Sequence, residues 1–120
     1  MTNYKRADRV ADLIRSEISD ICMRQLRDPR VGSITITDVH VTDDLKIAKI
    51  FFVRMGQDDC PPETRNGLDR ARGFLRRELG KRLQLRLVPE LNFVFDETFV
   101  HGSRIEKLLA EVRAEGEQDG

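Results

Sequence analysis

The sequence predicts a single α+β domain in which helices cover one face of a three-stranded sheet. Three observations support this class. Apolar residues recur with a helical period near both ends and in the middle of the chain, three short stretches alternate like strands, and no internal repeat or linker interrupts them. The expected order is helix, strand, strand, helix, helix, strand, helix. At 120 residues, the length suits one domain, which we place at residues 1–114.

Residues 8–26 predict a long amphipathic helix. Its apolar positions follow a 3.6-residue period: Val10, Leu13, Ile14, Ile18, Ile21 and Leu26. Pro29 disfavours helical geometry in the residue before it, so the helix should end there, with a turn at Gly32. Lys5, Arg6 and Arg9 crowd its first turns, where the helix dipole disfavours cations. Either a flexible basic end or a nucleic-acid-binding arm would account for them.

Residues 34–42 and 45–53 predict an antiparallel hairpin that turns at Asp43 and Asp44. In the first strand the apolar alternation slips by one residue between Ile36 and Val39, which predicts a bulge near Thr37 or Asp38. A third strand is expected at residues 91–96. A last helix is expected at residues 98–112, with an apolar stripe formed by Val100, Ile105, Leu108, Leu109 and Val112.

The stretch from residue 68 to residue 90 holds the densest pattern in the chain. A helix should begin at the second proline of the preceding loop, Pro62, or at Glu63. A straight helix would put Leu68, Ala71, Leu75, Leu79 and Leu83 on one stripe.

On that straight helix Phe74 would fall on the charged side. A break at Ala71-Arg72-Gly73 would turn Phe74 toward the core, so we expect two helices joined by a kink. The amides opening the second helix, flanked by Arg72, Arg76 and Arg77, would form a phosphate site.

Positive charge is concentrated in the same stretch. The whole chain balances 21 basic against 21 acidic residues, yet residues 70–86 hold seven basic residues and one acid, Glu78. A solvated helix face is the alternative, but such faces usually mix both signs, so a polyanionic partner is favoured. The candidate RNA-binding residues are Arg72, Gly73, Arg76, Arg77, Lys81, Arg82 and Arg86, with Lys5, Arg6, Arg9 and Arg30 as weaker candidates. Arg86 could reach a phosphate or pair with Glu90. Arg76 and Arg82 flank the apolar stripe and could instead lay their stems over it.

The remaining features point to a cytoplasmic, non-catalytic protein. Cys22 and Cys60 have no paired spacing, and no apolar run is long enough for a membrane span. His40 and His101 lack ligand spacing, so neither a metal nor a cofactor is expected. Asp96 could pair with His101 as acid and base, but one turn residue and one helix-start residue are a weak signal, so we expect Asp96 to cap the last helix or to pair with a basic side chain. Residues 115–120 predict a disordered acidic tail.

Several segments together resemble the bacterial ribosome-binding factor A family. They are Asp28-Pro-Arg30, Ile34-Thr-Ile36 to Asp38-Val-His-Val41, Asp44-Leu45 with Ala48-Lys-Ile50, Ala71-Arg72-Gly73 with Phe74-Leu-Arg76, Leu85 to Phe93, and Asp96. The resemblance spans roughly residues 4–112. It implies a KH-like domain of the second topological type, in which an Ala-x-Gly kink replaces the GxxG loop.

The resemblance also implies a function in assembly of the small ribosomal subunit. Members bind the immature particle, contact its ribosomal RNA near the decoding region, assist maturation of the RNA ends, and leave without catalysis. A monomer off the ribosome is expected.

Two other functions stay open. The chain could be a protein-interaction module whose first and last helices present a partner surface. It could also be a KH-like RNA-binding protein unconnected with the ribosome, one form of which would be a KH domain that reads single-stranded sequence; the missing GxxG counts against that form.

Overall fold

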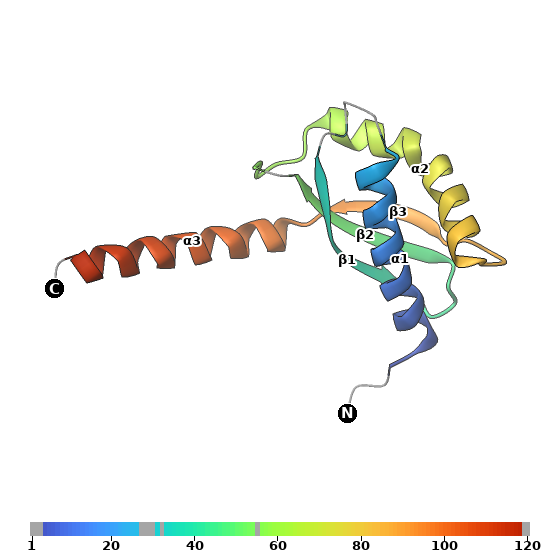
Figure 1. Ribbon diagram of the computed structural model, residues 1–120, viewed down its shortest axis with the longest axis horizontal. Coiled ribbons are helices and arrows are strands. Elements are labelled where there is room, and N and C mark those ends of the chain that lie inside the picture. Colours follow the sequence, from blue (N-terminus) through green and yellow to red (C-terminus); the bar gives the residue numbers. More distant parts are fainter. Residues whose placement is uncertain (1–3, 27–30, 32, 55, 119–120) are drawn as a thin grey trace.

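The computed structural model describes residues 4–26, 31, 33–54 and 56–118, which form three helices and three strands (Figure 1). In chain order they are α1 (Arg6–Arg24), β1 (Ile34–Val41), β2 (Ile47–Arg54), α2 (Pro62–Leu83), β3 (Glu90–Phe95) and α3 (Glu97–Gln118). The predicted α+β class is confirmed, and α2 begins at the second proline as expected. The predicted helix end at Pro29, the weaker candidate Arg30, the turn at Gly32 and residues 119–120 of the predicted tail lie outside the described residues.

The three strands form one mixed sheet in the order β1-β2-β3. β1 pairs antiparallel with β2, and the register shifts between Ile36 and Asp38, which confirms the predicted hairpin and bulge. β3 pairs parallel with β2, so α2 is the crossover that joins two parallel strands. This connection places α2 against the sheet.

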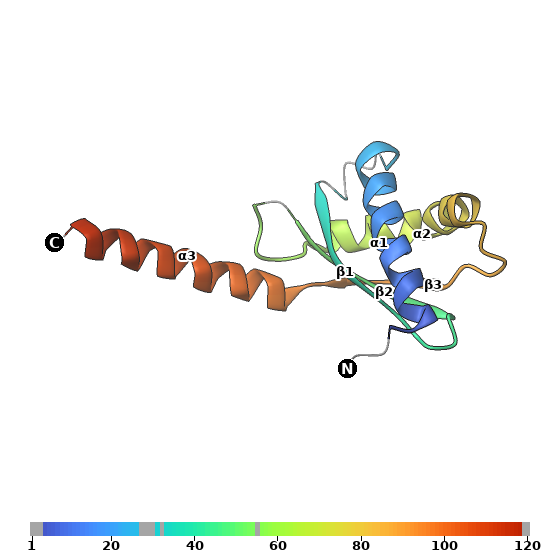
Figure 2. The ribbon, with the colours of Figure 1, turned by 60° about the horizontal axis from the view of Figure 1, so that its bottom comes forward.

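The core lies between the sheet and the two helices α1 and α2, which cover the same face (Figures 1 and 2). Its fully buried residues include Ile14, Ile18 and Ile21 of α1, Leu68, Leu75 and Leu79 of α2, and Ala48, Ile50, Phe52 and Leu91 of the sheet. The Phe52 ring meets the rings of Phe93 and Phe95 edge to face, with centroids 6.5 and 5.8 Å apart. Burying each large aliphatic side chain stabilises the fold by about 1.5–3 kcal/mol.

The predicted break of α2 into two helices is wrong. The helix is continuous from Pro62 to Leu83, through Ala71, Arg72 and Gly73. Its axis nevertheless turns between its green first half and its yellow second half (Figures 1 and 2). Glycine weakens a helix without having to break it, and a curved helix can wrap around the core. Phe74 is accordingly half-buried against the core.

The last helix departs most from expectation. α3 forms, but it extends away from the domain instead of packing on the sheet (Figures 1 and 2). β3 ends at Phe95 and α3 begins at Glu97, so a single residue connects them and gives α3 no length in which to turn back. The helix also continues through Gln118, so residues 115–118 are helical where the sequence predicts disorder.

The end of α2 offers a test of its cap. Gln84 takes the left-handed conformation, with φ 52°, and its side chain is exposed. Glycine adopts this conformation without steric cost, so Gln84→Gly should raise the free energy of unfolding by about 0.5–1 kcal/mol. Urea denaturation would measure the change. Lys81→Gly, inside the last helical turn, is the control and should lower stability by about 1 kcal/mol; a loss of stability in Gln84→Gly would contradict the assigned cap.

Candidate nucleic-acid interface

α2 separates an apolar seam from a charged outer face. Leu68, Ala71, Leu75 and Leu79 are buried against the core, as their spacing predicts. On the outer side Arg70, Gly73, Arg77 and Lys81 follow one another at intervals of three, four and four residues, which aligns them along one face of the helix. We call these four residues the basic stripe.

The basic stripe combines three exposed cations with a bare backbone. Arg70 and Arg77 are exposed, and Lys81 is 75% exposed with its Nζ 3.6 Å from Glu78. Gly73 lies between the two arginines and is also exposed. Apart from its own helix backbone, the one described atom that a Cβ at Gly73 would meet within 4 Å is the Arg77 Nη1, at 3.8 Å, so packing among the described residues does not require glycine there. Because Gly73 has no side chain, another molecule could approach the helix backbone closely at this point, between Arg70 and Arg77.

Two other predicted cations remain near this face. Arg72 donates a hydrogen bond to Asp69 at 2.7 Å and keeps 42% of its side chain exposed. Arg86 is exposed in the loop that follows α2. Both therefore keep side-chain surface in contact with solvent.

Arg76 is used inside the protein. Its Nη2 donates to the carbonyl oxygen of Val88 at 2.9 Å, and its Nε donates to that of Pro89 at 3.2 Å. Val88 also lies close to Gly80, where a Cβ would approach its Cγ2 to 3.0 Å. These contacts fasten the loop from α2 to β3 against the helix, so we assign Arg76 a structural role.

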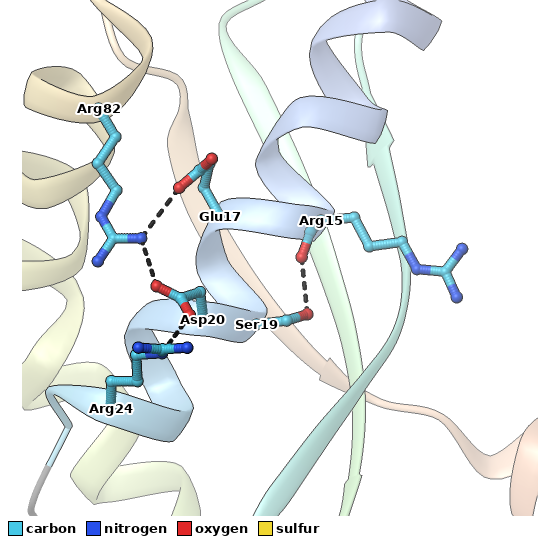
Figure 3. A network of polar contacts seen from close by, with 6 residues as sticks. All are labelled: Arg15, Glu17, Ser19, Asp20, Arg24 and Arg82. Carbon is cyan, nitrogen blue, oxygen red and sulfur yellow. Dashed lines mark hydrogen bonds and ion pairs between the residues drawn. The ribbon is translucent and has the colours of Figure 1, made fainter.

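Arg82 joins α2 to α1 through two carboxylates (Figure 3). Its Nη1 donates to Glu17 at 2.9 Å and to Asp20 at 2.7 Å, and Arg24 binds Asp20 from the other side at 2.7 Å. The hydrogen bond from Arg82 is the main reason that the pKa of Asp20 is lowered, and the same two carboxylates raise the pKa of Arg82. Arg82 is therefore a tether between the helices.

The amino-terminal cations occupy a separate element. The Lys5 amide donates to Asp8 at 2.8 Å, and the Lys5 Nζ lies 3.4 Å from Asp43. Arg6 and Arg9 are exposed beside Tyr4, whose hydroxyl donates to Asp12. The start of α1 lies toward the same end of the domain as the loop after α2, away from α3 (Figures 1 and 2).

The structure corrects the sequence-based site in two respects. Because α2 is continuous, the amides after Gly73 do not open a second helix, and the predicted phosphate site at a helix start is wrong. Arg70 belongs to the stretch of concentrated positive charge but is absent from the predicted site residues. Arg70 lies three residues before Gly73 and seven before Arg77. On a helix this spacing puts it on the same face, so the sequence already contained the signal that places Arg70 in the site.

The Asp, His and Cys side chains that could act in catalysis do not form a common site among the described residues. Asp96 accepts a hydrogen bond from the Thr37 hydroxyl at 2.6 Å and from the Phe99 amide at 3.0 Å, so it caps α3, as predicted, instead of pairing with His101. The exposed His40 side chain on β1 places its Nε2 2.9 Å from the Asp38 carboxylate. Burial raises the pKa of Cys22 to about 11. Among the described residues, no group of His, Cys, Asp and Glu could hold a metal ion.

Within the described part of the chain, no helix combines the length and apolar character that crossing a membrane requires.

Comparison with known sequences gives a consistent match. The sequence model of the family described as ribosome-binding factor A matches residues 6–109. Ribosome-binding factor A of Syntrophus aciditrophicus is 58% identical over 120 residues, covering 100% of this chain and 98% of that protein. The Syntrophobacter fumaroxidans protein of the same name is 51% identical over 111 residues, covering 91% and 95% of the two chains.

Solved structures share the fold. The crystal structure of ribosome-binding factor A from Thermus thermophilus superposes with a TM-score of 0.63 at 19% identity, covering 73% of this chain and 93% of that one. The solution structure of a putative ribosome binding factor A from Thermotoga maritima gives a TM-score of 0.63 at 29% identity, covering 78% and 90%. A Thermus thermophilus homology model fitted into a map of a 30S–RbfA complex gives 0.60 at 20%, covering 69% and 87%.

The tether made by Arg82 predicts a pH effect. Because the pKa of Asp20 is lowered, its contribution to stability is present above about pH 4 and is lost as pH falls through the lower folded value. Arg82→Gln removes the main cause of the lowered pKa. Its free energy of unfolding should therefore be lower at pH 7 and should fall less between pH 5 and pH 2 than in the wild type, by urea denaturation. Arg15→Gln, an exposed cation outside this tether, should keep the wild-type slope; equal slopes for all three proteins would contradict the role of Arg82.

Proposed function

Since this chain belongs to the ribosome-binding factor A family, we propose that it binds the small ribosomal subunit during assembly and contacts its ribosomal RNA through the basic stripe. The family match over residues 6–109 supports the first part. The structurally similar Thermus thermophilus model, which was fitted into a map of a 30S–RbfA complex, also supports binding to the small subunit. The second part rests on the charge and exposure of α2.

The single observation that carries the RNA contact is the arrangement of the basic stripe. Arg70, Gly73, Arg77 and Lys81 extend over about 16 Å of helix, a length that can follow several phosphates of one strand. The stripe contains no aromatic side chain on which a splayed base could stack, and Phe74 beside it is half-buried. Recognition of charge and backbone shape, more than of sequence, follows from this composition.

Gly73 suits such a contact because it lets the strand come close. In the middle of an exposed helical face, glycine costs about 1 kcal/mol relative to alanine. Among the described residues, no atom lies close enough to a Cβ built at Gly73 to require glycine there. A phosphate or ribose that approaches the backbone between Arg70 and Arg77 would explain why glycine occupies position 73.

The mechanism we propose is occupancy of the assembling particle. A protein that binds one arrangement of the RNA better than another shifts the folding equilibrium by its difference in affinity, without chemistry. In this way it would assist late maturation of the RNA and its ends. The protein would act as a monomer off the ribosome and in the cytoplasm.

Reversing the charge of the stripe tests the RNA contact. The double variant Arg77→Glu, Lys81→Glu should abolish binding to small subunits, because both side chains are exposed cations, and the domain should stay folded by circular dichroism. Arg76 is left out because its substitution would release the loop before β3. Arg15→Glu with Lys49→Glu changes the net charge equally on other exposed surfaces.

Co-sedimentation at several salt concentrations would measure these variants. The logarithm of the wild-type affinity should fall linearly with that of salt concentration, and a neutral Arg77→Gln variant should lower the slope by about 0.7–0.9 for each phosphate that it no longer neutralises. If the double Glu variant still co-sediments like the wild type, the basic stripe is not the RNA-binding surface.

Gly73→Ala should separate stability from binding. Alanine adds about 1 kcal/mol of helix stability, and its methyl group has room in the free protein. The same methyl group would stand where the RNA backbone approaches, so affinity for small subunits should fall several-fold. Denaturation and co-sedimentation of one variant would measure both effects. A more stable protein with unchanged affinity would show that no close approach occurs at Gly73.

A further inference from the structure

α3 exposes an apolar face that its own domain does not cover. Ile105, Leu108, Leu109 and Val112 lie within about a third of the helix circumference, and each is between 46% and 64% exposed. We call these four residues the α3 stripe. A solvent-exposed helix with such a stripe normally packs it against another element, because exposed apolar surface is costly in water.

The direction of α3 is fixed at its start. The Asp96 amide donates to the Phe52 carbonyl at 2.8 Å, and the Asp96 carboxylate accepts from Thr37 and from the Phe99 amide. This residue therefore ties the first turn of α3 to β1 and to the end of β2. Two turns later, Arg104 donates to Asp58 at 2.7 and 3.1 Å.

These attachments turn the α3 stripe away from the domain. Val100 and Arg104 are one turn apart on the helix face that lies against the loop before α2. On a helix with 100° per residue, the centre of the α3 stripe lies more than a quarter of a turn from that face. The rest of the helix projects free of the sheet (Figure 1). The stripe is therefore available to a partner.

The charge of α3 argues against RNA as that partner. Residues 97–118 contain five glutamates against Arg104, Lys107 and Arg113, a net charge of −2, and Arg104 is already paired with Asp58. Glu111 and Glu115 come within about a quarter of a turn of the stripe on one side. On the other side Glu106 is offset by Arg113, so the flanks still carry an excess of acid. A phosphate backbone would be repelled, whereas a basic protein surface would be attracted.

The size of the stripe argues against a second copy. Its four residues span only about 12 Å of helix, whereas a stable protein interface buries about 800 Å² on each partner. Two such helices would also bring their glutamates together. A groove in a larger surface can contact the flanks of the helix as well as the stripe, and so can bury more.

We propose that the α3 stripe docks into an apolar groove on a basic protein component of the small ribosomal subunit. This inference rests on the proposed function, and it adds a protein contact to the RNA contact of α2. The two surfaces lie on separate elements, with opposite charge, and each recognises a partner of the complementary charge.

The test compares two binding partners with one pair of variants. Leu108→Gln with Leu109→Gln removes apolar surface and keeps helix propensity, and Ala114→Gln on the opposite face is the matched control. Circular dichroism checks that α3 remains helical. Affinities are measured for intact small subunits and for small-subunit ribosomal RNA stripped of protein.

The double Gln variant should lose about tenfold or more in affinity for intact subunits and none for protein-free RNA. A photo-crosslinker at position 109 should attach to a basic ribosomal protein. Equal losses on both partners, no loss on either, or a crosslink to RNA, to a non-basic protein or to a second copy would overturn the proposal.

The charge-reversed α2 variant separates this inference from the proposed function. The Arg77→Glu, Lys81→Glu variant should lose binding to protein-free RNA as well as to subunits. If it loses neither while the Leu108 and Leu109 variant loses subunit binding, the RNA contact of α2 fails and the docking of α3 survives.

Discussion

The packing of α2 against the sheet is the contact on which the rest of the structure depends. α2 connects two parallel strands, so its apolar seam must lie on the sheet for β3 to pair with β2. Leu68, Leu75 and Leu79 are fully buried in this contact. Once the seam is fixed, the rotation of the helix is fixed too, and the opposite face must point to solvent. The position of the basic stripe is therefore a consequence of core packing.

Arginine serves two purposes on this helix, and the difference arises from geometry. Arg76 and Arg82 lie beside the apolar seam, where their long stems reach carbonyl oxygens and carboxylates of neighbouring segments. Arg70 and Arg77 lie on the outer face, where no hydrogen bond or ion pair joins their side chains to another described residue, and they remain exposed. The planar guanidinium group suits both uses, because it can bind several acceptors at once inside the protein or a phosphate outside it.

α3 shows how a short connection decides the use of an amphipathic helix. A single residue, Asp96, both ends the connection from β3 and caps the helix, so the helix cannot return to the sheet face that α1 and α2 already occupy. Its apolar side chains are left in solvent while its charges become negative toward the end of the chain. The molecule thus presents a basic helix face and an acidic apolar helix on different parts of its surface.

The sequence by itself determined the elements that depend on local pattern: the helical period of α1, the hairpin with its bulge near Thr37, the cap at Asp96 and the concentration of charge on α2. Tertiary structure decided what depends on distant neighbours. α2 stays helical through Gly73 while it packs on the core, and the internal role of Arg82 depends on carboxylates more than sixty residues away in the sequence. Periodicity likewise identified the apolar face of α3, but a pattern of residues along one helix carries no information about whether another element is near enough to cover it.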